Sequence, residues 1–245
     1  VLARGVIFVD LSLAQVAAFG GVLSVILGAH QSSPLTYLGS LIATFLASGI
    51  FFLAKKYEKS FSQEAIIGIV YALSSALVIL LVEDMPHGPE RIKELLVGQI
   101  LWVTWADVGK TALIYFSVGC LHFLFRKHFI ASSFSDHGKD RASFWDFLFY
   151  ALFGVVITSS VRLAGVLQVF SFLIVPALVA SMFCKSILSR LIFGWAFGLV
   201  FSVLGMFVSY HFDLPSGACL VFCFTSVPVL LLLLKPFLLK FKGIN

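Results

Sequence analysis

The amino-acid sequence predicts an all-α integral membrane protein, a polytopic helical bundle of about eight spanning helices plus a short outer helix that does not span. Of the 245 residues, 60% are hydrophobic and 12% are charged, whereas soluble domains have about 45–50% apolar and about 25% charged residues. The second observation is the apolar run 162–180, which one Gly, one Gln and one Pro interrupt. In lipid, a Pro frees a carbonyl that neighbouring helices must satisfy, and small residues let those helices approach. We therefore predict an inner helix in which Gly165 and Pro176 are helix-packing positions.

The spans follow from the order of the apolar stretches, because a spanning helix needs about 20 mainly apolar residues. The expected spans are 6–28, 35–54, 64–82, 109–127, 145–162, 165–184, 188–209 and 214–234. Residues 93–105 are too few to span, so we expect an outer or re-entrant piece there. We expect one transmembrane domain over 1–245, and the start at Val1 without an initiator Met leads us to expect one more helix before it.

The basic residues sort to one side of these spans, which predicts the orientation. Most of the 17 Lys and Arg residues fall on the expected cytoplasmic side. These are Arg4, Lys55, Lys56, Lys59, Arg126, Lys127, Lys139, Arg141, Lys185, Arg190, Lys235, Lys240 and Lys242. The net charge of +5 is thus dispersed around apolar spans, which indicates contact with membrane lipid and excludes nucleic acid as a partner.

The sequence contains no recognisable catalytic signature: no Gly-x-Ser-x-Gly elbow, no His-Glu-x-x-His and no phosphate-binding Gly-rich loop. Ser216 with His211 as a base would make an intramembrane hydrolase, a weaker alternative because such loop residues are usually turn formers. The four cysteines lie inside apolar runs without a second ligand pair nearby. We interpret them as small core residues.

The longest polar interval, 126–141, lies on the expected cytoplasmic side. Three apolar residues in it, Phe129, Ile130 and Phe134, fit one face of a short helix, and Asp136 is spaced to bond backbone donors. A solvated loop is one interpretation of this pattern. The other is a segment that docks into a groove on a soluble partner.

Ionisable residues inside spans are candidate functional groups, because they are unfavourable in lipid. Asp10 lies in a helix rich in small residues that also carries Gln15, and we expect it to face a path through the protein. Asp146 and Arg162 lie near span ends, where an interfacial anchor and a snorkelling side chain are the simpler interpretations. Asp213 lies at the outer mouth, where an N-cap of the last helix and ion contact both remain open.

Five segments that follow one another in a fixed order carry a resemblance to a known family. They are 4–20, 64–71, 95–101, the Gly-Val-Leu-Gln-Val-Phe-Ser-Phe-Leu-Ile-Val-Pro-Ala stretch at 165–177, and 213–218. With these motifs the chain resembles the permease subunits of the bacterial ATP-binding-cassette (ABC) importers that take up zinc, manganese or iron. Phe134-Ser-Asp136 is similar to the Ser-Phe-Asp pattern of that family's coupling segment, which favours docking over a solvated loop.

The resemblance implies a permease in the bacterial inner membrane that hydrolyses nothing itself. A separate ABC ATPase subunit would dock on a cytoplasmic coupling segment at 128–143. An extracytoplasmic metal-binding protein would deliver the ion, and a second permease subunit, with a homodimer expected, would complete the path. No cofactor is expected to bind tightly, since the divalent metal ion is the cargo.

The resemblance also nominates a transient metal path of Asp10, Gln15 and Asp213. Family members usually carry a His at the position of Gln15 and an Asp one turn earlier, where this chain has Leu11 beside Asp10. The nominated groups are all oxygen donors, which favours manganese or iron over zinc. Three outer-side histidines, His30, His87 and His211, would reverse that preference if the fold gathered them. The alternative function is a gradient-driven secondary transporter or channel, which an inverted repeat would favour, and we find none.

Overall fold

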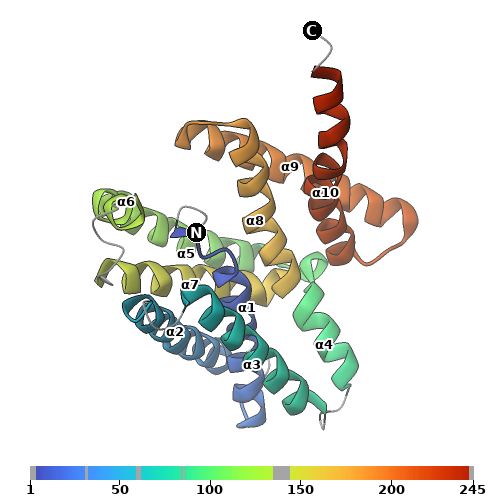
Figure 1. Cartoon of the computed structure of the whole chain (residues 1–245). Helices are drawn as coiled ribbons and strands as arrows, with labels where there is room; N and C mark the ends of the chain where they lie inside the picture. The colour runs from blue at the N-terminus through green and yellow to red at the C-terminus, as the bar shows by residue number, and fades with distance from the viewer. Residues whose placement is uncertain are drawn as a thin grey trace. The chain divides into compact units, whose positions relative to one another are not determined.

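The computed structural model describes residues 4–30, 33–58, 62–83, 85, 87–134 and 144–242, except for the side chains of residue 134 and of residues 234–242. Within these ranges every regular element is a helix (Figure 1). The elements are α1 (Val9–Ile26), α2 (Pro34–Lys56), α3 (Gln63–Glu83), α4 (Gly88–Val97), the 3₁₀ helix η2 (Ile100–Trp102), α5 (Trp105–Leu124), α6 (Arg126–Phe134), α7 (Phe144–Ala164), α8 (Val166–Phe183), α9 (Ile187–Phe212) and α10 (Ser216–Lys242).

Seven helices in the described ranges are long and apolar enough to cross a membrane, and the bent pair of α5 and α6 raises the number to eight. The predicted all-α membrane fold is confirmed, and α4 with η2 occupies the stretch expected not to span. The span expected near 109–127 corresponds to α5, which begins at Trp105 and ends at Leu124, and the chain then bends by 76° into α6. The charged pair Arg126-Lys127 ends the apolar run, which favours a turn at the membrane surface.

Side-chain caps set where several helices begin, because the first backbone N–H groups of a helix have no partner within it. Ser33 precedes Pro34 at the start of α2, and its Oγ accepts from the backbone N of Thr36 at 3.3 Å. Thr104 and Asp107 form a reciprocal capping box that starts α5. Such caps stabilise a helix by about 1 kcal/mol each.

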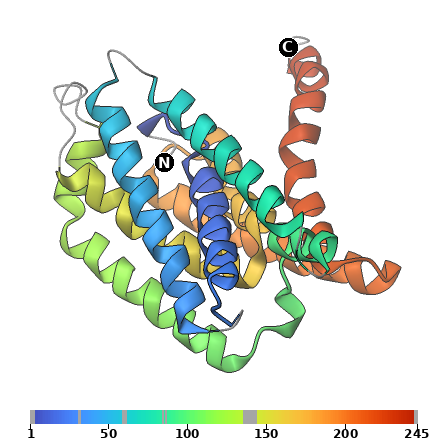
Figure 2. The ribbon, with the colours of Figure 1, turned by 90° about the horizontal axis from the view of Figure 1, so that it is seen from below.

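The first of two compact units, Val1–Val169, is built around α1. This helix packs against α2, α3 and α7, and Figure 2 shows it between α2 and α3. Two glycines permit the closest approach, since a Cβ on Gly20 would lie 2.6 Å from the carbonyl oxygen of Gly39. As a result 67% of α1 is buried, the largest share among the candidate spans.

A second close approach joins the end of α4 to the junction of α7 and α8. Gly98 and Gly165 both adopt positive φ, at 71° and 77°, a region that favours glycine. A Cβ on Gly165 would lie 2.8 Å from the carbonyl oxygen of Leu96, and one on Gly98 would lie 2.6 Å from the backbone N of Gly165. The C-terminal end of the non-spanning helix α4 therefore packs directly against the break between α7 and α8.

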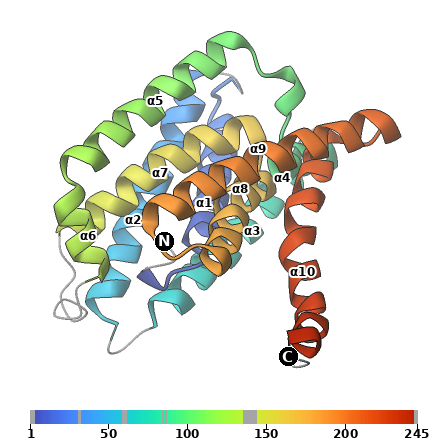
Figure 3. The ribbon, with the colours of Figure 1, turned by 90° about the horizontal axis from the view of Figure 1, so that it is seen from above.

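The second compact unit, Phe170–Asn245, contains most of α8 together with α9 and α10. Its core is apolar and aromatic, with Val175, Val179, Phe197 and Phe224 buried together. Pro176 lies inside α8, and Gly194 of α9 lies against it, since a Cβ there would be 3.8 Å from the Pro176 carbonyl oxygen. Figure 3 shows α9 and α10 meeting at their shared turn. That the chain functions as one permease domain stays a prediction.

Candidate functional site

Three polar side chains are buried in the first half of α1. Asp10 is 1% exposed, Ser12 0% and Gln15 6%. Oδ1 of Asp10 accepts a hydrogen bond from the backbone N of Leu11 at 2.8 Å. Across the described ranges, no cationic side chain lies within ion-pairing distance of this carboxylate. A buried carboxylate in a membrane is unfavourable without a counter-charge, so the position of Asp10 calls for an explanation, and its contact with a cation stays a prediction.

A cavity of about 280 Å³ lies beside the second half of α1, between that helix and α2, α4 and α7. The lining from α1 is made of small and aliphatic residues, namely Ala17, Ala18, Gly21, Val22 and Val25. The other three helices and the turn after α4 supply polar groups, among them Tyr37, Arg91, Glu94, Gln99, Thr158 and Arg162. Arg162, expected to snorkel, is thus exposed at a cavity wall.

The cavity-lining face of α1 continues to both nominated residues of that helix. A helix turns about 100° per residue, so Asp10, Ala14, Ala17 and Gly21 follow one another along one face. Gln15 is about 140° from Asp10 but lies one turn before Ala18, which also lines the cavity. An ion that moved along α1 would meet Gln15 and Asp10 in turn and not as one chelating pair.

Glu64, at the start of α3, is a further acidic group near Asp10 that was not nominated from the sequence. Its Oε1 accepts from the backbone N of Phe8 at 3.1 Å, and its side chain interacts electrostatically with Asp10. Oε2 of Glu64 is buried without a hydrogen-bond partner in the described part of the chain. In the sequence, Glu64 could have been recognised as an acidic residue in the first turn of the expected span 64–82.

Asp213 belongs to the second compact unit, whereas Asp10 and Gln15 belong to the first. It is exposed and ends α9 in the left-handed region, at φ 52°. The suggested N-cap role is therefore wrong, because α10 begins at Ser216. A path that includes all three residues stays a prediction.

The described ranges contain no group of three or more His, Cys, Asp or Glu side chains arranged to hold a metal ion. Of the three outer-side histidines, His30 and His87 belong to the first compact unit and His211 to the second, so a shared metal contact stays a prediction. Of the four cysteines, Cys120 is exposed, so the expectation that all four are core residues is wrong for that one. His211 stacks on Phe207, with ring centroids 6.0 Å apart.

The predicted docking residues lie in or after α6. Phe129 is 6% exposed and Ile130 is 50% exposed. The Phe129 ring stacks on His122 at a centroid distance of 4.6 Å and meets Trp145 edge to face at 5.8 Å. Phe129 thus anchors α6 on α5 and α7, while Ile130 remains available for a partner. Phe134 is the last residue of α6, and its side chain is not described. Asp136 and the rest of the segment 128–143 after α6 lie outside the described residues.

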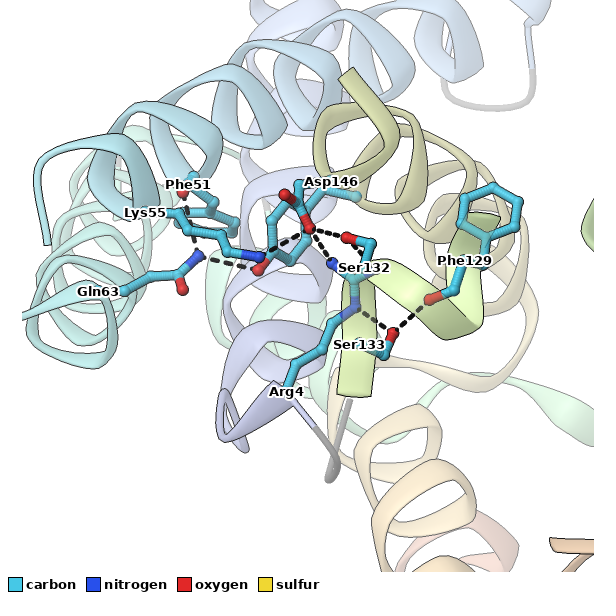
Figure 4. A network of polar contacts seen from close by, with 9 residues as sticks. Arg4, Phe51, Lys55, Gln63, Phe129, Ser132, Ser133 and Asp146 are labelled. Carbon is cyan, nitrogen blue, oxygen red and sulfur yellow. Dashed lines mark hydrogen bonds and ion pairs between the residues drawn. The ribbon is translucent and has the colours of Figure 1, made fainter. Parts of the chain in front are cut away.

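A buried ionic cluster lies beside α6, centred on Asp146 at the start of α7 (Figure 4). Oδ1 of Asp146 is 2.7 Å from Nη1 of Arg4 and 2.8 Å from Nζ of Lys55. Ser132 of α6 donates its hydroxyl to the same oxygen at 2.5 Å. Asp146 is 1% exposed and is therefore not the expected interfacial anchor. Sequence spacing did not reveal these contacts, because they join residues far apart in the chain.

Gln168, in the first turn of α8, is also a residue that we did not nominate. It is 0% exposed, and both amide atoms lack a hydrogen-bond partner in the described part of the chain. A buried amide without partners costs about 1–3 kcal/mol, so it calls for a function. The sequence feature that could have identified it is its position as the single Gln in the apolar run 162–180.

Comparisons with known proteins agree with this geometry. The family model described as "ABC 3 transport family" matches residues 1–235. The manganese transport system membrane protein MntC of Listeria monocytogenes is 28% identical over 194 residues, which cover 78% of this chain and 68% of that protein. A probable iron transport system membrane protein of Haemophilus influenzae is 28% identical over 205 residues, or 78% of this chain and 75% of that protein. PsaBC from Streptococcus pneumoniae, solved in complex with Fab, has a similar fold, with a TM-score of 0.73 and 24% identity over 92% of this chain and 80% of that one.

Proposed function

Since this chain belongs to the ABC 3 transport family, we propose that it is the multi-pass inner-membrane permease of an ABC importer whose cargo is a divalent metal ion. The observation that carries the proposal is the buried face of small residues on α1 that leads from the polar cavity to Asp10. That face runs from the polar cavity past Ala17 to Asp10, a carboxylate without an ion-pair partner among the described residues. The small side chains leave room along the helix, and the carboxyl group at its end is a group that can contact a cation inside an apolar bundle.

The choice of metal rests on the donor atoms that α1 presents. Asp10 and Gln15 offer carboxylate and amide oxygens, which suit hard cations such as manganese and iron(II) better than zinc. The names of the two relatives compared above refer to manganese and to iron. We therefore propose manganese or iron as the cargo and zinc as a weaker substrate. Asp213 would contact the ion at the outer end of the path.

Energy and delivery would come from other subunits. An ABC ATPase would dock on the exposed side of α6, where Lys127 and Ile130 reach solvent, and on the residues that follow α6, including Phe134 and Asp136. An extracytoplasmic metal-binding protein would deliver the ion at the cavity end of α1. A second copy of this chain would complete the transporter, and this chain itself would hydrolyse nothing.

Uptake by the reconstituted transporter tests the proposal. The permease, its ATPase and its binding protein would be placed in proteoliposomes, and Mn²⁺, Fe²⁺ and Zn²⁺ would be supplied in turn with and without ATP. We expect uptake of Mn²⁺ or Fe²⁺ that requires both ATP and the ATPase. Uptake driven by an ion gradient without the ATPase would instead establish the secondary-transporter alternative.

A further inference from the structure

The ionic cluster at Asp146 has a geometry that the transport path does not require. A single carboxylate oxygen receives Arg4 from the segment before α1, Lys55 from the end of α2 and Ser132 from α6. Asp146 itself belongs to α7. Four elements therefore meet at one atom, and three of them span the membrane or lead into a span.

Arg4 reinforces the connection between α6 and the segment before α1. Its Nε donates to Oγ of Ser133 at 3.0 Å, and its Nη2 donates to Oγ of Ser132 at 3.4 Å. The guanidinium group also lies over the Phe149 ring, 4.0 Å from the centroid. Because Arg presents several donors in a rigid plane, these contacts hold the side chain in one orientation. Only the five residues 5–9 separate Arg4 from Asp10.

The aromatic contacts of α6 join it to α5 and α7. Phe129 packs on His122 of α5 and on Trp145 and Phe149 of α7. These contacts hold α6 to its two neighbours in sequence. The contacts of Ser132 and Ser133 with Arg4 link α6 also to the segment before α1, and Asp146, which Ser132 contacts, is in turn paired with Lys55 of α2. Buried charge-assisted hydrogen bonds are strong and directional. They can therefore transmit a displacement that apolar contacts would absorb by sliding.

We propose that Asp146 is a positioning residue that couples α6 to α1 and α2. When the ATPase subunit displaces α6, the cluster would carry the movement through Arg4 to the start of α1 and through Lys55 to α2, which are two of the four helices that border the cavity. This inference rests on the proposed function. Asp146 does not touch the transported ion.

The first test measures transport and ATP hydrolysis together in the reconstituted transporter. For Asp146→Asn we expect the number of ions imported per ATP to fall at least about fivefold, while the ATPase still co-purifies. Asp146→Glu should restore at least half of the ratio, since it keeps the charge. Ser132→Ala removes the direct contact of α6 with Asp146 without removing a buried charge, and should lower the ratio about twofold because the contact of Ser133 with Arg4 remains. Ser48→Ala is the matched control, because among the described residues its hydroxyl donates only to the Thr44 carbonyl oxygen within α2.

If Asp146→Asn fails to assemble, the number of ions imported per ATP in Ser132→Ala tests the proposal. A ratio equal to that of Ser48→Ala would overturn the proposal. An equal loss in Asp146→Glu and Asp146→Asn would also overturn it, because a charge contact should be rescued by charge.

Hydrogen exchange on the purified permease provides a test that needs no ATPase, so it stands even if ATP-driven metal uptake fails. Asp146→Asn should speed exchange of the backbone amides in α6 and in the segment before α1, and Ser48→Ala should not. Unchanged protection of both segments in Asp146→Asn would show that the cluster does not hold them together.

Discussion

Asp10 and Asp146 are equally buried carboxylates, each 1% exposed, in regions of opposite character. Asp146 has two cations within 2.8 Å of one oxygen. Asp10 accepts a backbone hydrogen bond, and in the described part of the chain it has no cation at ion-pairing distance but does have a second carboxylate, Glu64, nearby. The Asp146 region contains its own counter-charges, whereas the Asp10 region offers carboxyl oxygens without a cationic partner among the described residues. We infer that the first region holds helices together and the second receives a mobile cation.

The largest expected effect is on stability at Asp146. Asp146→Asn leaves Arg4 and Lys55 without their counter-charge in a buried site, and breaking such a pair typically costs about 3–5 kcal/mol. Asp10→Asn removes a carboxylate without an ion-pair partner and keeps an oxygen for the Leu11 N–H, so its unfolding free energy should change by less than about 1 kcal/mol. Denaturant unfolding of both variants in detergent measures the difference. Equal destabilisation would remove the distinction between the two regions.

The next effect concerns transport at Asp10. Asp10→Asn should lower the rate of Mn²⁺ uptake about tenfold, equivalent to about 1.4 kcal/mol, because the amide has no charge with which to attract a cation. ATP hydrolysis by the docked ATPase should continue. The control is Ser74→Ala on α3, whose hydroxyl donates only to carbonyl oxygens of its own helix. Wild-type uptake by Asp10→Asn would show that the carboxylate is a packing element.

The smallest effect concerns metal preference at Gln15. Gln15→His replaces an amide oxygen with an imidazole nitrogen, which favours zinc, and the ratio of zinc to manganese uptake should rise about fivefold. Competition between the two ions in a strain without its own importers measures the ratio. An unaltered ratio would place the metal-selective contacts elsewhere, leaving Asp10 as the charged contact on α1.

The sequence was sufficient for the fold because membrane spans are local features. Apolar length predicted the spanning helices, and the short stretch at 93–105 predicted the non-spanning piece that became α4 and η2. The bend at Phe125 was missed, since the apolar run continues to the residue before the charged pair. Of the two roles left open for Asp213, the N-cap role was suggested by the nearby Pro215, whereas the residue ends α9.

The contacts of the candidate site were less predictable, since they depend on tertiary packing. Asp10 and Gln15 were visible as polar residues in an apolar helix. The cluster of Arg4, Lys55, Ser132 and Asp146 was not, because its members come from four elements and each looks like an ordinary residue near a span end. Gln168 was seen as an interruption of an apolar run, but only packing shows that its amide lacks partners.

Cysteine accessibility along α1 tests most directly the claim that its cavity-lining face is the metal path. In a background with the four native cysteines replaced, Ala17→Cys lies on the face shared with Asp10, and Phe19→Cys lines a separate apolar groove between α1, α2 and α3. A membrane-impermeant cationic thiol reagent added from outside should block Mn²⁺ uptake through Ala17→Cys and leave Phe19→Cys active. Unimpaired uptake through labelled Ala17→Cys, or equal block of both variants, would contradict the account.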